Sequence, residues 1–229
     1  MSQQLLLVND TSSSPNQGCQ ATMAALNAGI AQFFPEWNVS RISLDTIARP
    51  TADPNWKALL PEGPNDCAGA VKKLLQSADP DLARIYDAFR MADLIIVNGE
   101  GSIAENRRTR RLGEQSIFLF LLLALSHHLD KPIHLINGTL HLTRADSLAL
   151  AKPPLERCAT VTVREPFSYY HVRKIHPEVR LFPDLVVTLP VPEPPSIDAP
   201  YIMLGGSYSV KGIMRSTHMK KKVTGNSDS

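Results

Sequence analysis

Short apolar runs alternate along this chain with longer segments in which apolar residues recur at helical spacing. The runs that we expect to be strands are residues 4–8, 38–44, 94–97, 132–136, 160–163 and 179–181. The segments that we expect to be helices are residues 19–34, 66–76, 80–91, 115–129, 143–157 and 166–175. Because strands that alternate with helices form βαβ units, the pattern predicts an α/β fold with a Rossmann-like, mostly parallel sheet and helices on both faces.

Prolines modify this outline in two segments. Residues 48–65 are rich in Pro, Asp and Asn, which predicts an irregular segment. We expect the helix over residues 143–157 to be interrupted at Pro153 and Pro154, because proline lacks the N–H that a helix interior needs.

The C-terminal part of the chain breaks the pattern. We expect residues 1–190 to form the Rossmann-like domain and the proline-rich residues 191–200 to form a semi-rigid linker. Residues 201–210 form an apolar run that ends in glycines, as the first strand of a second domain would. Residues 211–229 are polar and basic without periodicity, which predicts a disordered tail.

Charge and cysteine content narrow the class of protein. The formal net charge is only +2, and the basic residues concentrate in the tail instead of along a folded face, so we expect no nucleic-acid partner. The three cysteines are widely spaced and odd in number, which indicates free thiols in a reducing compartment. No apolar run is long enough to span a bilayer, so we expect a cytoplasmic protein that is not transmembrane.

Candidate chemistry gathers where the predicted strands end. Asn98-Gly99-Glu100-Gly101-Ser102 directly follows a β-branched apolar run. In open α/β sheets, ligands bind outside the carboxyl ends of the strands, and glycines there let the backbone turn and approach a ligand. Glu100 is therefore a carboxylate in the place where such folds carry out their chemistry.

Other polar residues occupy equivalent positions. The further candidates near predicted strand ends or helix starts are Asn9, Asn16, Gly18, Asn137, Arg164 and Ser168. His127 and His128 close an apolar helix, where they suit the negative end of its dipole. Two histidines offer too few ligands for a metal site, and we expect none.

The order of four motifs resembles the polysaccharide pyruvyl transferase family over about residues 4–210. The motifs are Asn16-Gln17-Gly18, Asn98-Gly99-Glu100-Gly101-Ser102, Arg164-Glu165-Pro166-Phe167-Ser168 and Pro183-Asp184. The resemblance implies a fold similar to the N-terminal half of a two-domain glycosyltransferase type B arrangement. It also implies transfer of a pyruvyl group from phosphoenolpyruvate to a hydroxyl pair on a sugar of a cell-surface polysaccharide. Phosphoenolpyruvate would be the donor substrate, a glycan or lipid-linked sugar the acceptor, and no cofactor would be needed.

This chemistry suggests roles for two residues. Arg164 would contact the phosphoenolpyruvate anion, because arginine binds phosphate and carboxylate through two hydrogen bonds. The alternative for Arg164 is a salt bridge to Glu165 or Asp184. Glu100 would bind sugar hydroxyls or act as general base, and its alternative is to cap the following helix.

The remaining candidates would line the substrate site. They are Asn9, Asn16, Gly18, Asn98, Gly99, Gly101, Ser102, Asn137 and Ser168. A dense cationic cluster at residues 107–111 would either contact an anionic acceptor or remain a solvated surface.

The chain departs from the family in its C-terminal part. A type B arrangement places its active site between two domains, and we find only a first strand of the second domain. We therefore expect a truncated member of the family with weak or no turnover. Two other functions stay open: a nucleotide-sugar-dependent glycosyltransferase and a non-catalytic glycan-binding domain. Homo-oligomerisation and peripheral association with a membrane also stay open.

Overall fold

The computed structural model describes residues 2–106 and 109–190. These residues belong to one compact unit, Met1–Pro190. The linker, strand and tail predicted over residues 191–229 lie outside the described residues, as do two arginines of the cationic cluster, Arg107 and Arg108.

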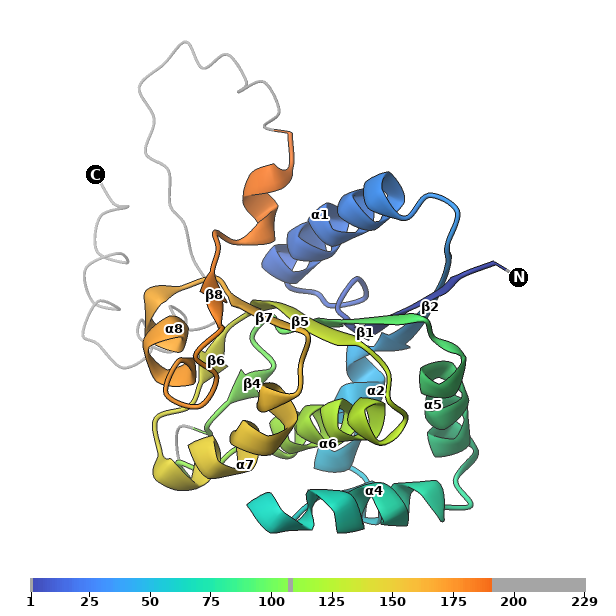
Figure 1. The fold of residues 1–229 in the computed structure, drawn as a ribbon, viewed down its shortest axis with the longest axis vertical. Helices are drawn as coiled ribbons and strands as arrows, with labels where there is room; N and C mark the ends of the chain where they lie inside the picture. Colours follow the sequence, from blue (N-terminus) through green and yellow to red (C-terminus); the bar gives the residue numbers. More distant parts are fainter. Residues whose placement is uncertain (1, 107–108, 191–229) are drawn as a thin grey trace, which may run out of the picture. The chain divides into compact units, whose positions relative to one another are not determined.

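The core of the described unit is a parallel sheet of six strands in the order β2-β1-β3-β5-β7-β8 (Figure 1). The strands are β1 (Gln4–Asp10), β2 (Asn38–Ser43), β3 (Leu94–Asn98), β5 (Ile133–Gly138), β7 (Thr160–Val163) and β8 (Arg180–Leu181). Two short strands that the sequence did not predict, β4 (Ile103–Ala104) and β6 (Leu140–His141), form a separate parallel pair. The predicted Rossmann-like α/β class is confirmed.

Helices cover both faces of this sheet. The α-helices are α1 (Gln17–Phe33), α2 (Leu44–Ala48), α3 (Pro54–Lys57), α4 (Cys67–Leu75), α5 (Pro80–Met91), α6 (Glu114–His128), α7 (Ala145–Glu156) and α8 (Pro166–Val172). Three short 3-10 helices complete the unit: η1 (Arg49–Thr51), η2 (Pro64–Asp66) and η3 (Leu185–Thr188). Figure 1 shows α1 on one face of the sheet and α2, α5, α6 and α7 on the other.

The continuous apolar run of β1 reflects burial on both faces. Leu5 and Leu7 pack with residues of α1 such as Met23, whereas Leu6 and Val8 belong to the larger core on the opposite face. That larger core contains most of α6, whose apolar residues surround the helix on all sides, as expected for a fully buried helix. Among the described helices, none has the length and apolar character to cross a membrane.

Two local predictions were wrong. Residues 48–65 are not irregular throughout, because they contain η1, α3 and the start of η2. Helix α7 is not interrupted, since it runs through Pro153 and Pro154 to Glu156. The two prolines lie in the last turn, so no further turns depend on the hydrogen bonds they cannot make.

The strand order reverses beside β1. The chain places β2 on one side of β1 and then crosses to place β3 on the other side. Such a reversal leaves a crevice outside the carboxyl ends of β1 and β3, where ligands bind in this class of fold. The residues that follow β1 and β3 therefore lie beside this crevice.

Candidate functional site

Four predicted clusters of polar residues meet at one edge of the sheet. β1, β3, β5 and β7 are neighbours, and all four run in the same direction. Their carboxyl ends therefore bring together residues that lie more than 150 positions apart in the sequence, from Asn9 to Arg164. We call this region the carboxyl-edge site.

Asn9 and Asn98 join the ends of β1 and β3. The side-chain amide of Asn9 donates to the backbone oxygen of Asn98 over 2.6 Å and to the hydroxyl of Ser102 over 2.8 Å. Both asparagines are fully buried. The Oδ1 atom of Asn9 has no hydrogen-bond partner among the described residues, so one buried acceptor at this edge is unsatisfied.

Glu100 is held by side chains from three other segments. Its carboxylate accepts from the hydroxyl of Thr22 at 3.2 Å and lies 3.5 Å from that of Thr11. Arg164 approaches the same carboxylate to 3.4 Å. Within the described residues these contacts involve hydroxyls and a guanidinium instead of the backbone N–H groups that a helix cap would use.

Arg164 lies between two carboxylates. Its Nη1 atom is 2.5 Å from Asp184 and 3.4 Å from Glu100, while Nε donates to the hydroxyl of Thr139 over 2.7 Å. The side chain of Asp184 also accepts from the amide of Asn137 at 3.4 Å. One of the two predicted alternatives for Arg164, the salt bridge to Asp184, is thus present, whereas Glu165 instead caps α8.

The charges of this cluster do not cancel. One guanidinium, Arg164, faces the carboxylates of Glu100 and Asp184, and only 21% of the Arg164 side chain is exposed. Arg41 and Asp10 form a further pair at 3.0 Å near the end of β1. Burial acts to raise the pKa of Asp10, but hydrogen bonds from Ser12 and Arg41 outweigh it and hold that pKa below its usual range.

A thiol that the sequence did not single out also lies here. Cys19, in the first turn of α1, is close enough to Glu100 and Arg164 for their charges to act on it. Burial raises the pKa of this thiol, and the negative charge of Glu100 raises it further. The thiol is therefore protonated at neutral pH. Cys19, Cys67 and Cys158 form no disulfide.

The other predicted residues occupy more local positions. Asn16 caps α1 by accepting from the backbone N–H of Gly18, and both residues are exposed. Ser168 is fully buried, and its hydroxyl bonds to the backbone of Leu140. Gly99 and Gly101 form the turn after β3, where Gly101 has a φ of +58°.

Sequence analysis missed several residues that surround Glu100. Thr11 and Thr22 hold its carboxylate, and Thr139 holds Arg164. Thr22 lies one turn after Gly18 on the side of α1 that faces the sheet, but its partner is 78 positions away. No local pattern marks such a contact. Asp184 was predicted as part of the Pro183-Asp184 motif and as one of two possible partners of Arg164, but its contact with Asn137 was not.

Histidines and acidic residues offer no metal site in the described segments, where no group of three such side chains has suitable geometry. His127 and His128 lie in the last turn of α6, as predicted. They lie at the opposite edge of the sheet, because α6 ends just before β5 begins.

Comparison with known proteins identifies the family. A model of the polysaccharide pyruvyl transferase family matches residues 16–224. The chain belongs to the polysaccharide pyruvyl transferase family. No curated protein and no solved structure shows significant similarity to it. The family match includes the helix start at Asn16, the Glu100 turn and Arg164, so the carboxyl-edge site lies largely within the matched region.

Proposed function

We propose that this chain transfers a pyruvyl group from phosphoenolpyruvate to two hydroxyls of a sugar in a cell-surface polysaccharide, forming a ketal. The family match carries the proposal. The contact between Glu100 and Arg164 supports it, because a carboxylate and a guanidinium from motifs 64 residues apart meet at the carboxyl edge. The free thiols favour a reducing compartment such as the cytoplasm, where the donor would be available.

Glu100 would accept a proton from an acceptor hydroxyl. Two threonine hydroxyls and Arg164 orient its carboxylate, and a general base must be held in a fixed orientation toward the proton that it accepts. Asn9 Oδ1, which is buried and has no partner among the residues that the structure describes, would accept a hydrogen bond from the substrate. Asn98, Ser102 and Asn137 would hold these groups in place.

Arg164 would contact the donor. A guanidinium has five N–H donors, and its Nη2 group makes no hydrogen bond within the described part of the chain. The start of α1 at Asn16 and Gly18 offers a second favourable place for an anion, because the free N–H groups of a helix N-terminus carry partial positive charge. Gly99, Gly101 and Ser168 would shape the turns around the site.

We expect turnover by these residues to be weak. Phosphoenolpyruvate is an anion, whereas the described cluster has two carboxylates for one guanidinium. Efficient catalysis relies on charges that are already aligned with the reacting atoms. Further cations would have to come from residues outside the described part of the chain or from a change on binding.

The direct test supplies the 229-residue chain with phosphoenolpyruvate and either a β-galactoside or a lipid-linked N-acetylmannosamine acceptor. Ketal formation is followed by mass spectrometry and phosphate release by a coupled assay. We expect slow ketal formation that Glu100→Gln lowers by about a hundredfold or more, since a general base contributes at least this much. Arg164→Lys should raise the KM for phosphoenolpyruvate about tenfold, because lysine cannot form the paired contact.

Two exposed residues provide matched controls. Glu36→Gln, just before β2, and Arg90→Lys, in the last turn of α5 before β3, make the same chemical changes at the amino edge of the sheet and should leave the rate unchanged. Fast turnover by the wild-type chain would contradict the expectation of weak activity. Absence of ketal, together with a rise in melting temperature caused by nucleotide sugars but not by phosphoenolpyruvate, would overturn the proposed reaction.

A further inference from the structure

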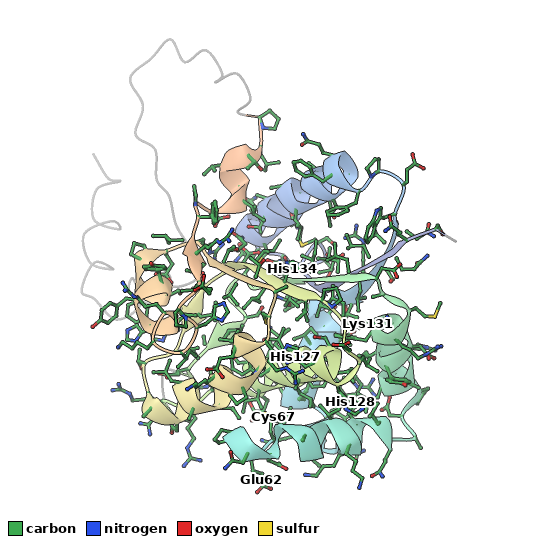
Figure 2. The ribbon with its side chains drawn as sticks, viewed as in Figure 1. Glu62, Cys67, His127, His128, Lys131 and His134 are labelled. Atoms are coloured by element: carbon green, nitrogen blue, oxygen red, sulfur yellow. The ribbon has the colours of Figure 1, made fainter. Side chains whose placement is uncertain are left out.

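A hollow lies at the edge of the sheet opposite the carboxyl-edge site. It is enclosed by α4, α6 and the end of α7, and its volume of about 480 Å³ is within the range of small-molecule pockets. His127 and His128 immediately precede β5, and Arg157 precedes β7, so the hollow belongs to the amino edge of the sheet. Cys67 of α4 and both histidines line this hollow, and Figure 2 labels them. We call it the amino-edge pocket.

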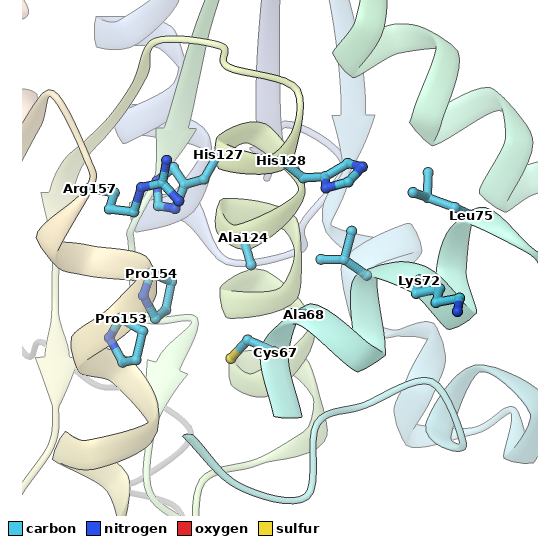
Figure 3. A pocket seen from close by; sticks show the side chains of 11 residues that line it. Cys67, Ala68, Lys72, Leu75, Ala124, His127, His128, Pro153, Pro154 and Arg157 are labelled. Atoms are coloured by element: carbon cyan, nitrogen blue, oxygen red, sulfur yellow. The ribbon is translucent and has the colours of Figure 1, made fainter. Parts of the chain in front are cut away.

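The floor and walls of the amino-edge pocket are apolar or small. Ala124 of α6 lies at its centre, between Cys67 on α4 and the rings of Pro153 and Pro154 on α7 (Figure 3). Most neighbours of Ala124 along α6 are leucine or phenylalanine, so the small side chain at this position leaves the space open. Such a surface favours a hydrocarbon group.

The rim of the pocket is basic. Its eleven lining residues include two cations, Lys72 and Arg157, and the histidines His127 and His128, and none of the eleven is acidic. Neither Lys72 nor Arg157 forms an ion pair in the part of the chain that the structure describes, whereas nearby Lys152 pairs with Glu156. The rim therefore has positive charge that the described side chains leave uncompensated.

His127 adds an unsatisfied group. Its Nε2 atom is buried and has no hydrogen-bond partner within the described residues. Burial, together with the charge of Arg157, lowers the pKa of His127 to about 4, so the imidazole is neutral at pH 7. A buried polar atom without a partner is unfavourable, and a ligand atom that bonds to it would remove this cost.

The helix ends limit where an anion can lie. α6 and α7 both end at the pocket, and their last carbonyl groups carry partial negative charge. An anion without an apolar part would therefore gain little here. A head group beside Arg157 and His127, with a tail along Ala124, would gain both charge neutralisation and apolar burial.

We propose that the amino-edge pocket binds an amphiphilic anion, with a hydrocarbon tail over Ala124 and one phosphate or carboxylate head group at Arg157 and His127. The site is separate from the carboxyl-edge site and does not depend on the reaction proposed there.

The test titrates the full chain with octyl phosphate, octanoate, octanol and inorganic phosphate by isothermal calorimetry. We expect octyl phosphate and octanoate to bind at least about tenfold more tightly than octanol or inorganic phosphate, because only they supply both tail and charge. Equal affinity for octanol would reduce the site to an apolar surface. Equal affinity for inorganic phosphate would reduce it to a simple anion site. Either result overturns the proposal.

Variants locate the binding. Ala124→Phe fills the floor and Arg157→Gln removes the exposed cation, and each should weaken octyl phosphate binding at least about tenfold. Arg157→Gln should leave the affinity for octanol unchanged. Lys73→Gln, next to Lys72 but not part of the pocket, is the matched control and should change affinity less than about twofold. If both pocket variants bind octyl phosphate as tightly as the wild type, the proposal is wrong. If Ala124→Phe fails to fold, the result for Arg157→Gln decides, because the Arg157 side chain is exposed and its replacement should not disturb folding.

Discussion

Asn9 and Asn137 owe their positions to backbone conformation. Both have positive φ angles, +64° and +55°, and both lie where the register of strand pairing shifts near a strand end. Asparagine tolerates this left-handed conformation better than most residues. An asparagine at a strand end therefore predicts a left-handed residue that bends the backbone. This bend turns the asparagine side chain toward the ends of the neighbouring strands.

His127 predicts a pH dependence of stability. Its pKa falls from 6.5 to about 4 on folding. Between these pH values the unfolded chain therefore binds a proton at His127 more readily than the folded chain does. The contribution of His127 to the free energy of unfolding is fully present above pH 6.5 and is lost as the pH falls from 6.5 toward 4. Discounted for partial exposure, the loss is about 1–2 kcal/mol, or a few degrees in melting temperature.

Thermal unfolding between pH 4 and pH 7.5 measures this effect. His127→Gln cannot titrate, so its melting temperature should decrease less over that range than that of the wild type. The exposed neighbour provides the control, because His128→Gln should follow the wild-type curve. If the melting temperatures of the wild type and His127→Gln decrease in parallel, the imidazole of His127 does not contribute to the pH dependence of stability.

At the scale of elements, the turn after β3 is constrained by the strand beside it. A Cβ atom on Gly99 would lie 2.7 Å from the Cα of Gly138, and one on Gly138 would also meet close neighbours. The ends of β3 and β5 thus approach each other more closely than side chains allow. Packing between the two strands therefore requires a glycine at position 99, whether or not a ligand approaches the backbone there.

Gly99→Ala should lower the free energy of unfolding by about 1–3 kcal/mol, because the added methyl group meets backbone that must move. Gly29→Ala is the matched control. Its Cβ would have open space within α1, and alanine favours a helix, so stability should rise by about 0.5–1 kcal/mol. Urea denaturation of the two variants compares them directly. A neutral Gly99→Ala would refute the close strand contact.

At the scale of the molecule, one helix connects most of the core. α6 lies under the sheet and packs against α4, α7 and the short helices of residues 44–57. Phe118 of α6 is fully buried, with its ring centroid 5.3 Å from that of Trp56. A segment that looked irregular in the sequence therefore supplies a large side chain to the main core.

Phe118→Ala should decrease the free energy of unfolding by about 3–5 kcal/mol, since it removes a buried aromatic ring and leaves a cavity. Phe33→Ala makes the same change where 72% of the residue is exposed, and its effect should be less than about 0.5 kcal/mol. Both values follow from urea denaturation. Similar losses in the two variants would contradict the assigned core.

The sequence by itself determined the class of fold, the order of the main strands and helices and the strand ends where polar residues gather. These features follow from local patterns: apolar runs, helical spacing, glycine turns and helix caps. Glu100 and Arg164 stood out for the same reason.

Only the tertiary structure decided which of these residues meet. Arg164 lies between Glu100 and Asp184, and Thr22 holds Glu100, because the parallel sheet places β1, β3, β5 and β7 side by side. The amino-edge pocket likewise needs α4, α6 and α7 together. Contacts between residues tens of positions apart depend on strand order and helix packing, and no local pattern encodes them.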